Sequence, residues 1–545
     1  MQKRTITCMI STLIFAAVFF VNVPADTNAQ VTEEWVAVYN GPGNGLDGAN
    51  DLIIGPNGNI YVTGMSSDIS TGYDFDTVCY DPNGNVLWSA RYDGKGDWGD
   101  EAFSITTDLI GNVYVTGTSH NTDGNYDYIT ISYNSSGSQQ WIARYNGPAN
   151  WHDRAFAITT DTLGNIYVTG ESIGIGTGGD YATIKYDSLG NEVWVARWSS
   201  ASSGNIERAI AIAVDSLGNV YVTGIGDYGG GIWDCTTIKY NSFGNEQWVA
   251  RYSFFDAGLE ESKAISVDSA GNVFVSCSGG TIAYDSQGNV LWVQTGYEGR
   301  DLILDSMGNV YVTGWTRVND VWGDYFTVVY DSNGQELWNA TYNGPENKTD
   351  KANAIALDNM GNVFVAGGSD GIGSFQDYTT IAYDSMGNEL WIALYNGLGS
   401  FHDSISGIAV DPLGNVYVTG TARGLGTDRD WVTIKYSYKV PKPEPTIDID
   451  PDTLNLKSKG RWITCYIDLP GYDVNDIDIG TVILEDTIPA EWGDVQNDTL
   501  MVKFDRSKVE DILSPGSYNL KVTGEFMDGT VFEGYSDEIR VIEPP

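Results

Sequence analysis

The sequence predicts an all-β protein: an eight-bladed β-propeller closed by its N-terminal strand and followed by a small C-terminal β-sandwich (Ig-like) domain. Three observations carry this prediction. Repeat tryptophans recur every 44 to 54 residues, short runs rich in Val, Ile, Thr and Tyr alternate with turns, and Gly accounts for 65 of the 545 residues. Periods of about 40 to 50 residues with four strand-like runs are typical of propeller blades.

The repeat is clearest between residues 153 and 197. It consists of the four runs DRAFAITTD, GNIYVTG, DYATIKYD and GNEVWVAR, which we expect to form four antiparallel strands. The first and third runs each leave through an Asp-initiated turn that contains Gly, which fits a type I turn followed by a left-handed glycine. The turn after the first strand occurs eight times in the chain, whereas the turn after the third strand occurs seven times.

The missing turn predicts how the ring closes. After the eighth third strand, at residues 431–436, the chain runs into SYKVPKPEP, while the N-terminus begins with an unpaired fourth-strand run, EEWVAVY, at residues 33–39. We therefore expect the N-terminal strand to complete blade eight and to remove an exposed sheet edge. An open solenoid or two smaller propellers are the alternatives.

Four segments follow along the chain. Residues 1–29 are expected to be a signal peptide, because Lys3 and Arg4 precede an apolar run, with cleavage after Ala25 or Ala29. The alternative is a membrane anchor, for which the apolar run is short. Residues 30–437 form the propeller, 438–445 a Pro-rich linker, and 446–545 the sandwich, in which apolar positions alternate.

Charge and cysteine content limit the partners. Acidic residues outnumber basic ones 72 to 29, a formal charge of −43, which disfavours nucleic acid and anionic lipid. We expect a secreted or cell-surface monomer without a membrane-spanning segment after signal removal. Cys79, Cys235, Cys277 and Cys465 lack metal-ligand spacing, so neither a zinc site nor a disulfide scaffold is predicted. A bridge between Cys235 and Cys277, in neighbouring blades, is the alternative.

The linked motifs GNIYVTG and DYATIKYD, followed by a Gly-Asn turn and a tryptophan, resemble the bacterial SBBP β-propeller repeat family. The resemblance covers roughly residues 33–436 and implies a propeller fold and an extracellular setting rather than a reaction. The family name implies seven blades, whereas the repeats here number eight. The segment MVKFDRSKVEDIL with LKVTGEFMDGTVFEG is similar to an accessory module at the C-terminus of secreted bacterial proteins.

Two series of acidic residues recur on the face where the fourth-to-first and second-to-third strand connections emerge. We interpret them as structural, accepting backbone N–H bonds from adjacent loops. The alternative is Ca²⁺ bound by oxygen ligands at this rim, and no other cofactor is expected. The metal candidates of the first series are Asp47, Asp100, Asp153, Asp350 and Asp403, while the second series comprises Asp74, Asp127, Asp180, Asp234, Asp324, Asp377 and Asp430.

Irregular loop residues on the same face are the candidates for ligand binding. Aromatic rings beside Asp and Asn suit sugar rings, although packing of the loops over the blades is the alternative. These candidates are Trp98, Trp151, His152, Trp315, Trp322, Phe401 and His402. The repeated tryptophans are interpreted as contacts between blades.

No catalytic residue is assigned, because with only three histidines in the chain a Ser-His-Asp arrangement has few ways to form. The sequence favours a non-catalytic propeller that presents a loop face for binding a protein or a carbohydrate, or for scaffolding. A quinoprotein-like or polysaccharide-active enzyme is one alternative, and a structural surface-layer component is another.

Overall fold

The computed structural model describes residues 30–543, apart from gaps at 69–71, 95–98, 201–204, 228–232, 255–259, 317–322, 372–374, 398, 400–401, 425–427, 440–444, 470–471, 473, 497–498 and 528–530. The expected signal peptide and most of the linker therefore lie outside the described residues. The described chain forms two compact units, residues 31–438 and 439–545. In the described part, no helix has the length and apolar character needed to cross a membrane.

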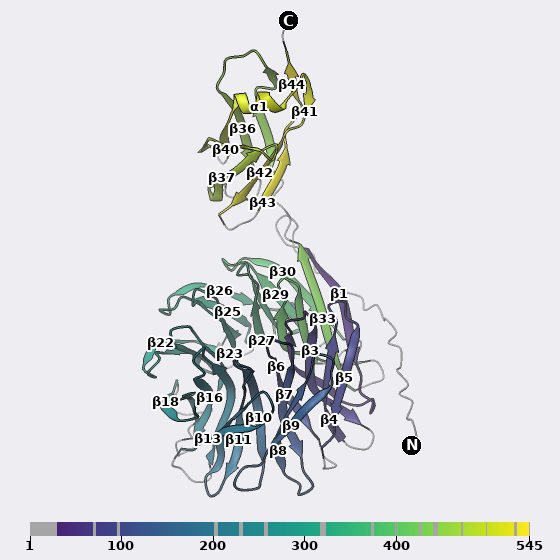
Figure 1. Ribbon diagram of the computed structural model, residues 1–545, viewed down its shortest axis with the longest axis vertical. Helices are drawn as coiled ribbons and strands as arrows, with labels where there is room; N and C mark the ends of the chain where they lie inside the picture. Colours follow the sequence, from purple (N-terminus) through teal and green to yellow (C-terminus); the bar gives the residue numbers. More distant parts are fainter. Residues whose placement is uncertain are drawn as a thin grey trace. The chain divides into compact units, whose positions relative to one another are not determined.

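The first unit consists of antiparallel four-stranded sheets, and the described residues contain eight of them in sequence order (Figure 1). Sheet 1 comprises β2 Asp47–Ile54, β3 Ile60–Asp68, β4 Gly72–Tyr80 and β5 Val86–Tyr92, and sheet 2 comprises β6 Glu101–Thr107, β7 Val113–His120, β8 Tyr126–Tyr133 and β9 Gln139–Tyr145. Sheet 3 comprises β10 Asp153–Thr160, β11 Ile166–Gly174, β12 Gly178–Tyr186 and β13 Glu192–Trp198, with the short β14 Asn205–Ile206. Sheet 4 comprises β15 Arg208–Val214, β16 Val220–Asp227, β17 Trp233–Tyr240 and β18 Glu246–Tyr252.

Sheet 5 comprises β19 Ser262–Val267, β20 Val273–Cys277, β21 Gly280–Tyr284 and β22 Val290–Thr295, and sheet 6 comprises β23 Tyr297–Leu304, β24 Val310–Thr316, β25 Tyr325–Tyr330 and β26 Glu336–Tyr342. Sheet 7 comprises β27 Asp350–Leu357, β28 Val363–Asp370, β29 Gln376–Tyr383 and β30 Glu389–Tyr395. Sheet 8 comprises β31 Ser404–Val410, β32 Val416–Ala422 and β33 Asp430–Lys439, and it is completed by β1 Gln30–Tyr39. The all-β prediction is confirmed.

The sheets are arranged around a ring with their first strands innermost. The first strand of each sheet contacts the first strand of the next, and β31 of sheet 8 contacts β2 of sheet 1. The second strands are the most completely buried, since both faces of each sheet are covered by its neighbours. The N-terminal strand β1 lies beside β33, so residues at the two ends of this unit share one sheet.

Tryptophans of the fourth strands join each sheet to the next. Trp88 of sheet 1 packs against Tyr61 of its own sheet at 5.8 Å and Tyr133 of sheet 2 at 5.9 Å between ring centroids. Its indole nitrogen donates to the Ser135 carbonyl at 3.1 Å. Gly137, at a φ of 79°, lets the ring approach, because a Cβ there would lie 2.5 Å from it.

Strand β1 supplies this contact for sheets 8 and 1. Trp35 packs 6.0 Å from both Tyr417 of sheet 8 and Tyr80 of sheet 1, and its indole nitrogen donates to the Pro82 carbonyl at 3.1 Å. A Cβ on Gly84 would lie 2.7 Å from its ring. The contact therefore matches that of Trp88, although β1 is separated from the rest of sheet 8 by about 400 residues of chain.

Sheet 8 lacks the turn that receives the tryptophan in the other sheets, because its fourth strand comes from the other end of the unit. Trp391 of sheet 7 instead packs against Tyr436 at 6.0 Å and Tyr438 at 5.9 Å. Its buried indole nitrogen has no acceptor among the described residues. Tyr438 in turn donates to Asp358 Oδ2 at 3.1 Å, which anchors the end of β33 to sheet 7.

The second unit is also built of strands, and its three sheets share one apolar core that includes Cys465, Val502, Val482, Val522 and Val541. Its sheets comprise β34 Thr446–Asp450, β36 Trp462–Asp468, β40 Thr499–Asp505 and β39 Trp492–Gln496; β35 Thr453–Asn455, β44 Ile539–Ile542 and β41 Gly516–Tyr518; and β38 Ile488–Pro489, β37 Ile477–Leu484, β42 Lys521–Phe526 and β43 Val531–Tyr535.

Two short helices interrupt the strands of the second unit, the 3₁₀ turn Val474–Asp476 and α1 Arg506–Ile512. Helix α1 lies in a segment for which the sequence suggests only strands. It begins where the Asp505 carboxylate accepts the Ser507 N–H at 2.8 Å, an N-cap that a seven-residue helix needs and that strand periodicity does not reveal.

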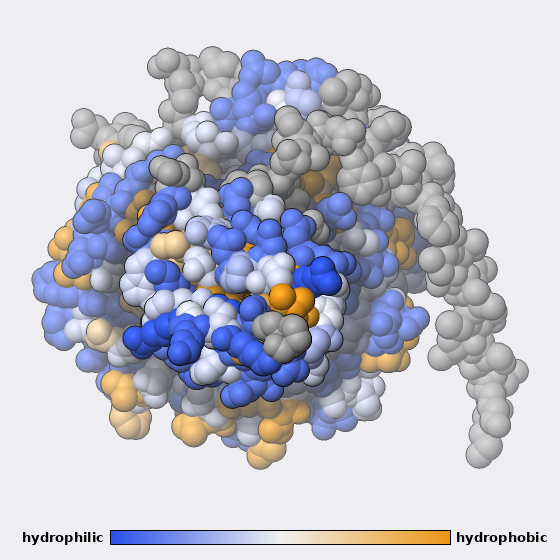
Figure 2. Space-filling model, turned by 90° about the horizontal axis from the view of Figure 1, so that it is seen from above, coloured by the Kyte–Doolittle hydropathy of each residue, from blue (hydrophilic) through white to orange (hydrophobic). Residues whose placement is uncertain are grey.

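The surface is mostly hydrophilic, with apolar residues as separate spots in the view of Figure 2. Several exposed apolar side chains are at the tips of the Asp-initiated turns, for example Leu163, Leu217 and Leu413, each at least 79% exposed. Isolated exposed apolar residues are common on folded proteins and carry no function by themselves.

Candidate binding face

The first acidic series holds the loops at the beginning of the first strands, except in sheet 6, where Tyr297 takes its place. Asp47 is fully buried, and its Oδ2 accepts the Gly41 N–H at 2.7 Å while its Oδ1 accepts the Ser67 N–H at 2.8 Å. One carboxylate thus connects the segment that enters the sheet to the end of its second strand.

The other four metal candidates of this series repeat this arrangement. Each is buried, and Oδ2 of each accepts an N–H bond from the glycine six residues earlier. For Asp100, Asp153, Asp350 and Asp403 the donors are Gly94, Gly147, Gly344 and Gly397 at 2.5 to 2.8 Å. Burial raises the pKa of Asp153 to about 6 and that of Asp403 to about 7, in spite of these bonds. The geometry favours the structural interpretation, because the oxygens point at backbone donors.

The second series differs from sheet to sheet. In sheets 1 to 4 its carboxylates are paired with an arginine near the end of the fourth strand: Arg91 with Asp74 at 2.7 Å, Arg144 with Asp127 at 3.0 Å, Arg197 with Asp180 at 2.7 Å, and Arg251 with Asp234. Sheets 5 to 8 carry Thr295, Thr341, Leu394 and Val38 at that position. The backbone of the sheets therefore repeats around the ring, whereas the arginine that pairs with the second acidic series is present only in sheets 1 to 4.

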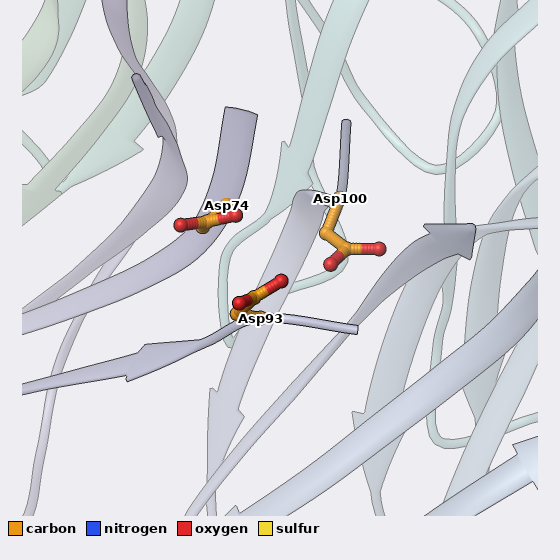
Figure 3. Close-up of side chains that lie close together, drawn as sticks. All are labelled: Asp74, Asp93 and Asp100. Carbon is orange, nitrogen blue, oxygen red and sulfur yellow. The ribbon is translucent and has the colours of Figure 1, made fainter. Parts of the chain in front are cut away.

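Three carboxylates from the two series and a neighbouring loop converge near sheet 1 (Figure 3). Asp74 of β4, Asp93 after β5 and Asp100 before β6 each place one oxygen within 4.8 Å of the others. Asp93 is exposed, whereas Asp74 and Asp100 are buried. Because Arg91 already pairs with Asp74 and the Gly94 N–H with Asp100, a cation would have to compete with both partners.

Two of the aromatic candidates belong to one cluster on the loop face of sheets 2 and 3. Trp151 is 54% exposed and its ring lies 5.1 Å from that of His152. His152 lies 5.2 Å from Tyr126, which lies 4.7 Å from His120 on its other side. Burial lowers the pKa of His152, which favours the neutral imidazole. The cluster offers one exposed indole beside polar ring nitrogens.

The remaining candidates lie elsewhere. His402 packs against Phe375 at 4.9 Å beside sheet 7, and Trp315 is buried at the end of β24 in sheet 6. Trp98, Phe401 and Trp322 lie outside the described residues. The structure therefore distributes the described candidates over three places on the ring and does not bring them together.

Basic residues near the beginning of the first strands belong to no sequence motif and were not among the predicted site residues. Their positions are one or three residues after the position of the first acidic series, at the beginning of the first strands. They are Arg154, Arg208, Lys263, Arg300 and Lys351, all half-buried. A comparison of these two positions across the repeats would have found them, because they vary from repeat to repeat, whereas the acidic position loses its carboxylate only in sheet 6, to Tyr297.

Comparison with known proteins supports the repeat assignment. The β-propeller repeat model SBBP matches residues 140–176 and 391–426. Similar solved structures include a protein of unknown function from Bacteroides caccae (11% identity, 51% of this chain and 94% of that chain, TM-score 0.31) and one from Dyadobacter fermentans (8%, 52% and 94%, TM-score 0.33). The extracellular domain of a proposed one-component system from B. thetaiotaomicron is a third (12%, 91% and 81%, TM-score 0.25). No curated protein is significantly similar to this chain.

Proposed function

Because this chain carries β-propeller repeats of the SBBP type, we propose that it is a secreted or cell-surface protein, without catalytic activity, whose loop face binds carbohydrate. In this proposal the eight sheets are the blades of one closed propeller, and the second unit is an Ig-like accessory sandwich. A propeller uses its regular residues for packing and its irregular loop residues for recognition.

The exposed indole of Trp151 is the observation that supports this proposal most directly. Most candidate residues of the loop face are engaged: the five acidic residues of the first series hold backbone N–H groups, and Trp315 is buried. Trp151, in contrast, is 54% exposed next to His152, whose ring also contacts Tyr126. Sugar rings stack their C–H faces on such a ring, while neighbouring polar groups bind hydroxyls.

A glycan array probed with residues 30–545 tests the proposal. We expect binding of at least one carbohydrate class, and a loss of about tenfold or more in affinity for the variant Trp151→Ala, since central aromatic residues dominate such contacts. Trp492→Ala is the matched control, because Trp492 is 42% exposed and belongs to the second unit. Binding of no carbohydrate, or an equal loss in both variants, would contradict the proposal.

A further inference from the structure

Five basic residues form a cationic rim on the inner side of sheets 3 to 7. The rim is defined as Arg154, Arg208, Lys263, Arg300 and Lys351, which lie near the beginning of the first strands β10, β15, β19, β23 and β27. Each of five consecutive sheets contributes one of them, whereas the two corresponding positions of sheets 1, 2 and 8 hold no basic residue. In a chain with 29 basic residues among 545, this is a concentrated group.

Trp315 holds two of these cations together. The Arg300 guanidinium carbon lies 4.1 Å from the centroid of the Trp315 ring, and the Lys351 ammonium nitrogen lies 4.9 Å from it. The two charged centres are thus no further apart than the sum of these distances, 9.0 Å. Cation–π attraction offsets their mutual repulsion, and Trp315 is buried, so the pair is preformed.

Some of the rim charge is balanced and some is not. Arg208 pairs with Glu171 at 3.1 Å, Lys263 with Glu261, and Arg300 with Glu298 at 3.2 Å. Within the described residues, no carboxylate lies in ion-pair distance of Lys351. The buried Nε of Arg300 likewise has no acceptor there. Arg154 and Lys351 are therefore the two rim cations without an ion pair among the described residues, and Lys351 lies beside Trp315.

The positive charge of the rim contrasts with the formal charge of the whole chain, −43. Charges separated by more than about 8 Å are largely screened at physiological ionic strength. The distant acidic surface therefore has little effect on an anion at the rim, and the charges next to the anion decide whether it is held. An anion between Arg300 and Lys351 would also relieve the repulsion between them.

Aromatic side chains lie on the same rim. Phe103 and Phe156, from the first strands of sheets 2 and 3, are half-buried with ring centroids 5.5 Å apart, and the Arg208 guanidinium lies 5.4 Å from Phe156. Half-buried rings beside Arg208 suit a ligand that carries anionic groups on partly apolar units, as sugar acids do.

We propose that the cationic rim is a binding site for an oligosaccharide that carries carboxylate or sulfate groups, with Arg300 and Lys351 as its main anion site and Trp315 as the residue that positions them. The inference rests on the proposed function, which it deepens by naming the ligand class. In this proposal the rim binds the anionic groups of the oligosaccharide, and the exposed Trp151 cluster contacts its uncharged sugar faces.

The test is calorimetric titration of residues 30–545 with three oligosaccharides of equal length: a uronate, its uncharged methyl ester and a sulfated form. We expect the uronate or the sulfated form, but not the ester, to bind. The variants Lys351→Gln and Arg300→Gln should each weaken this binding about tenfold or more, since charge-assisted bonds dominate it. The affinity should also fall with added salt.

Lys185→Gln is the matched control. Its ammonium lies 5.0 Å from the Tyr167 ring, nearly the Lys351–Trp315 distance, but at the opposite end of a sheet, and the change in net charge is identical. We expect this variant to bind like the unchanged protein. Melting temperatures of all three variants, measured alongside, separate a loss of binding from a loss of folding.

The outcomes separate the two proposals. Equal binding of uronate and ester, or an unchanged affinity in both Arg300→Gln and Lys351→Gln, overturns the rim site, even if Trp151-dependent carbohydrate binding persists. Equal binding of a glutamate peptide of matched charge would overturn the assignment to carbohydrate and make the rim a site for acidic peptides. Binding of none of the three oligosaccharides overturns the rim site, whereas the proposed function is overturned only if the glycan array is negative as well.

Discussion

Removal of the N-terminal strand is the most direct perturbation of the ring. A chain that begins at residue 41 lacks β1, so β33 becomes an exposed edge of sheet 8 with unpaired backbone groups. The deletion also removes Trp35 from its position between Tyr80 and Tyr417, and it removes the bond of the Tyr39 hydroxyl to Asp76 Oδ2 at 2.9 Å.

The structure gives the size of the effect. Loss of a packed tryptophan side chain costs about 3 to 5 kcal/mol, and the half-buried Trp35 belongs at the lower end of this range. The hydrogen bond of Tyr39 to Asp76 adds about 1 to 2 kcal/mol, because burial raises the pKa of Asp76 to about 7 and the carboxyl is only partly ionised at neutral pH. A loss of roughly 5 kcal/mol is comparable to the whole stability of many domains, about 5 to 15 kcal/mol.

Urea unfolding and light scattering compare chains that begin at residues 30 and 41. We expect the shorter chain to unfold at lower urea and to self-associate, and a peptide of residues 30–40 to restore the monomer by strand addition. The same peptide with Trp35→Ala should restore much less. In the full chain, Trp35→Ala and Trp88→Ala should cost similar free energies, since their contacts match. A truncated chain that is equally stable and monomeric would refute ring closure by β1.

Three further predictions concern acidic residues and thiols. Burial raises the pKa of Asp403 to about 7, so the stability that this group contributes is complete below about pH 4 and is lost as the pH rises through about 7. In urea titrations, Asp403→Asn should therefore lower the free energy of unfolding less at pH 8 than at pH 5. An equal loss at both pH values would contradict this prediction. Because Arg91 and a backbone N–H occupy the acidic trio, millimolar Ca²⁺ should leave the melting temperature unchanged; a rise that Asp93→Asn abolishes would instead show a cation site. Burial raises the pKa of Cys235 well above its usual value, so Cys235 and Cys277 should react with a thiol reagent only after denaturation; a thiol count in denaturant that falls short by two would reveal a bridge.

Several features followed from the sequence because they depend on residues close together in the chain. The strand runs, their alternation and the glycine turns repeat within about 50 residues, and the expected all-β structure is the one observed. The surplus strand at residues 33–39 was also visible, because a repeat with seven third-strand turns and eight first-strand turns leaves one fourth strand to be supplied.

Other features depend on contacts between residues that are far apart in the chain. Trp315 is buried beneath Arg300 and Lys351, so it positions cations instead of offering an exposed ring, and only the packing of sheet 6 against sheet 7 brings Lys351 to it. The other described aromatic candidates, the Trp151 cluster and His402, lie apart because they belong to sheets that are not neighbours in the ring.

The sequence by itself therefore determined the repeating strands, their turns and the strand available for closure, since local periodicity and turn chemistry decide these. The tertiary structure decided which side chains meet at the inner ends of the first strands. These residues are about 50 positions apart in the chain and meet only because the sheets surround a common axis, which is the reason the cationic rim has no sequence motif.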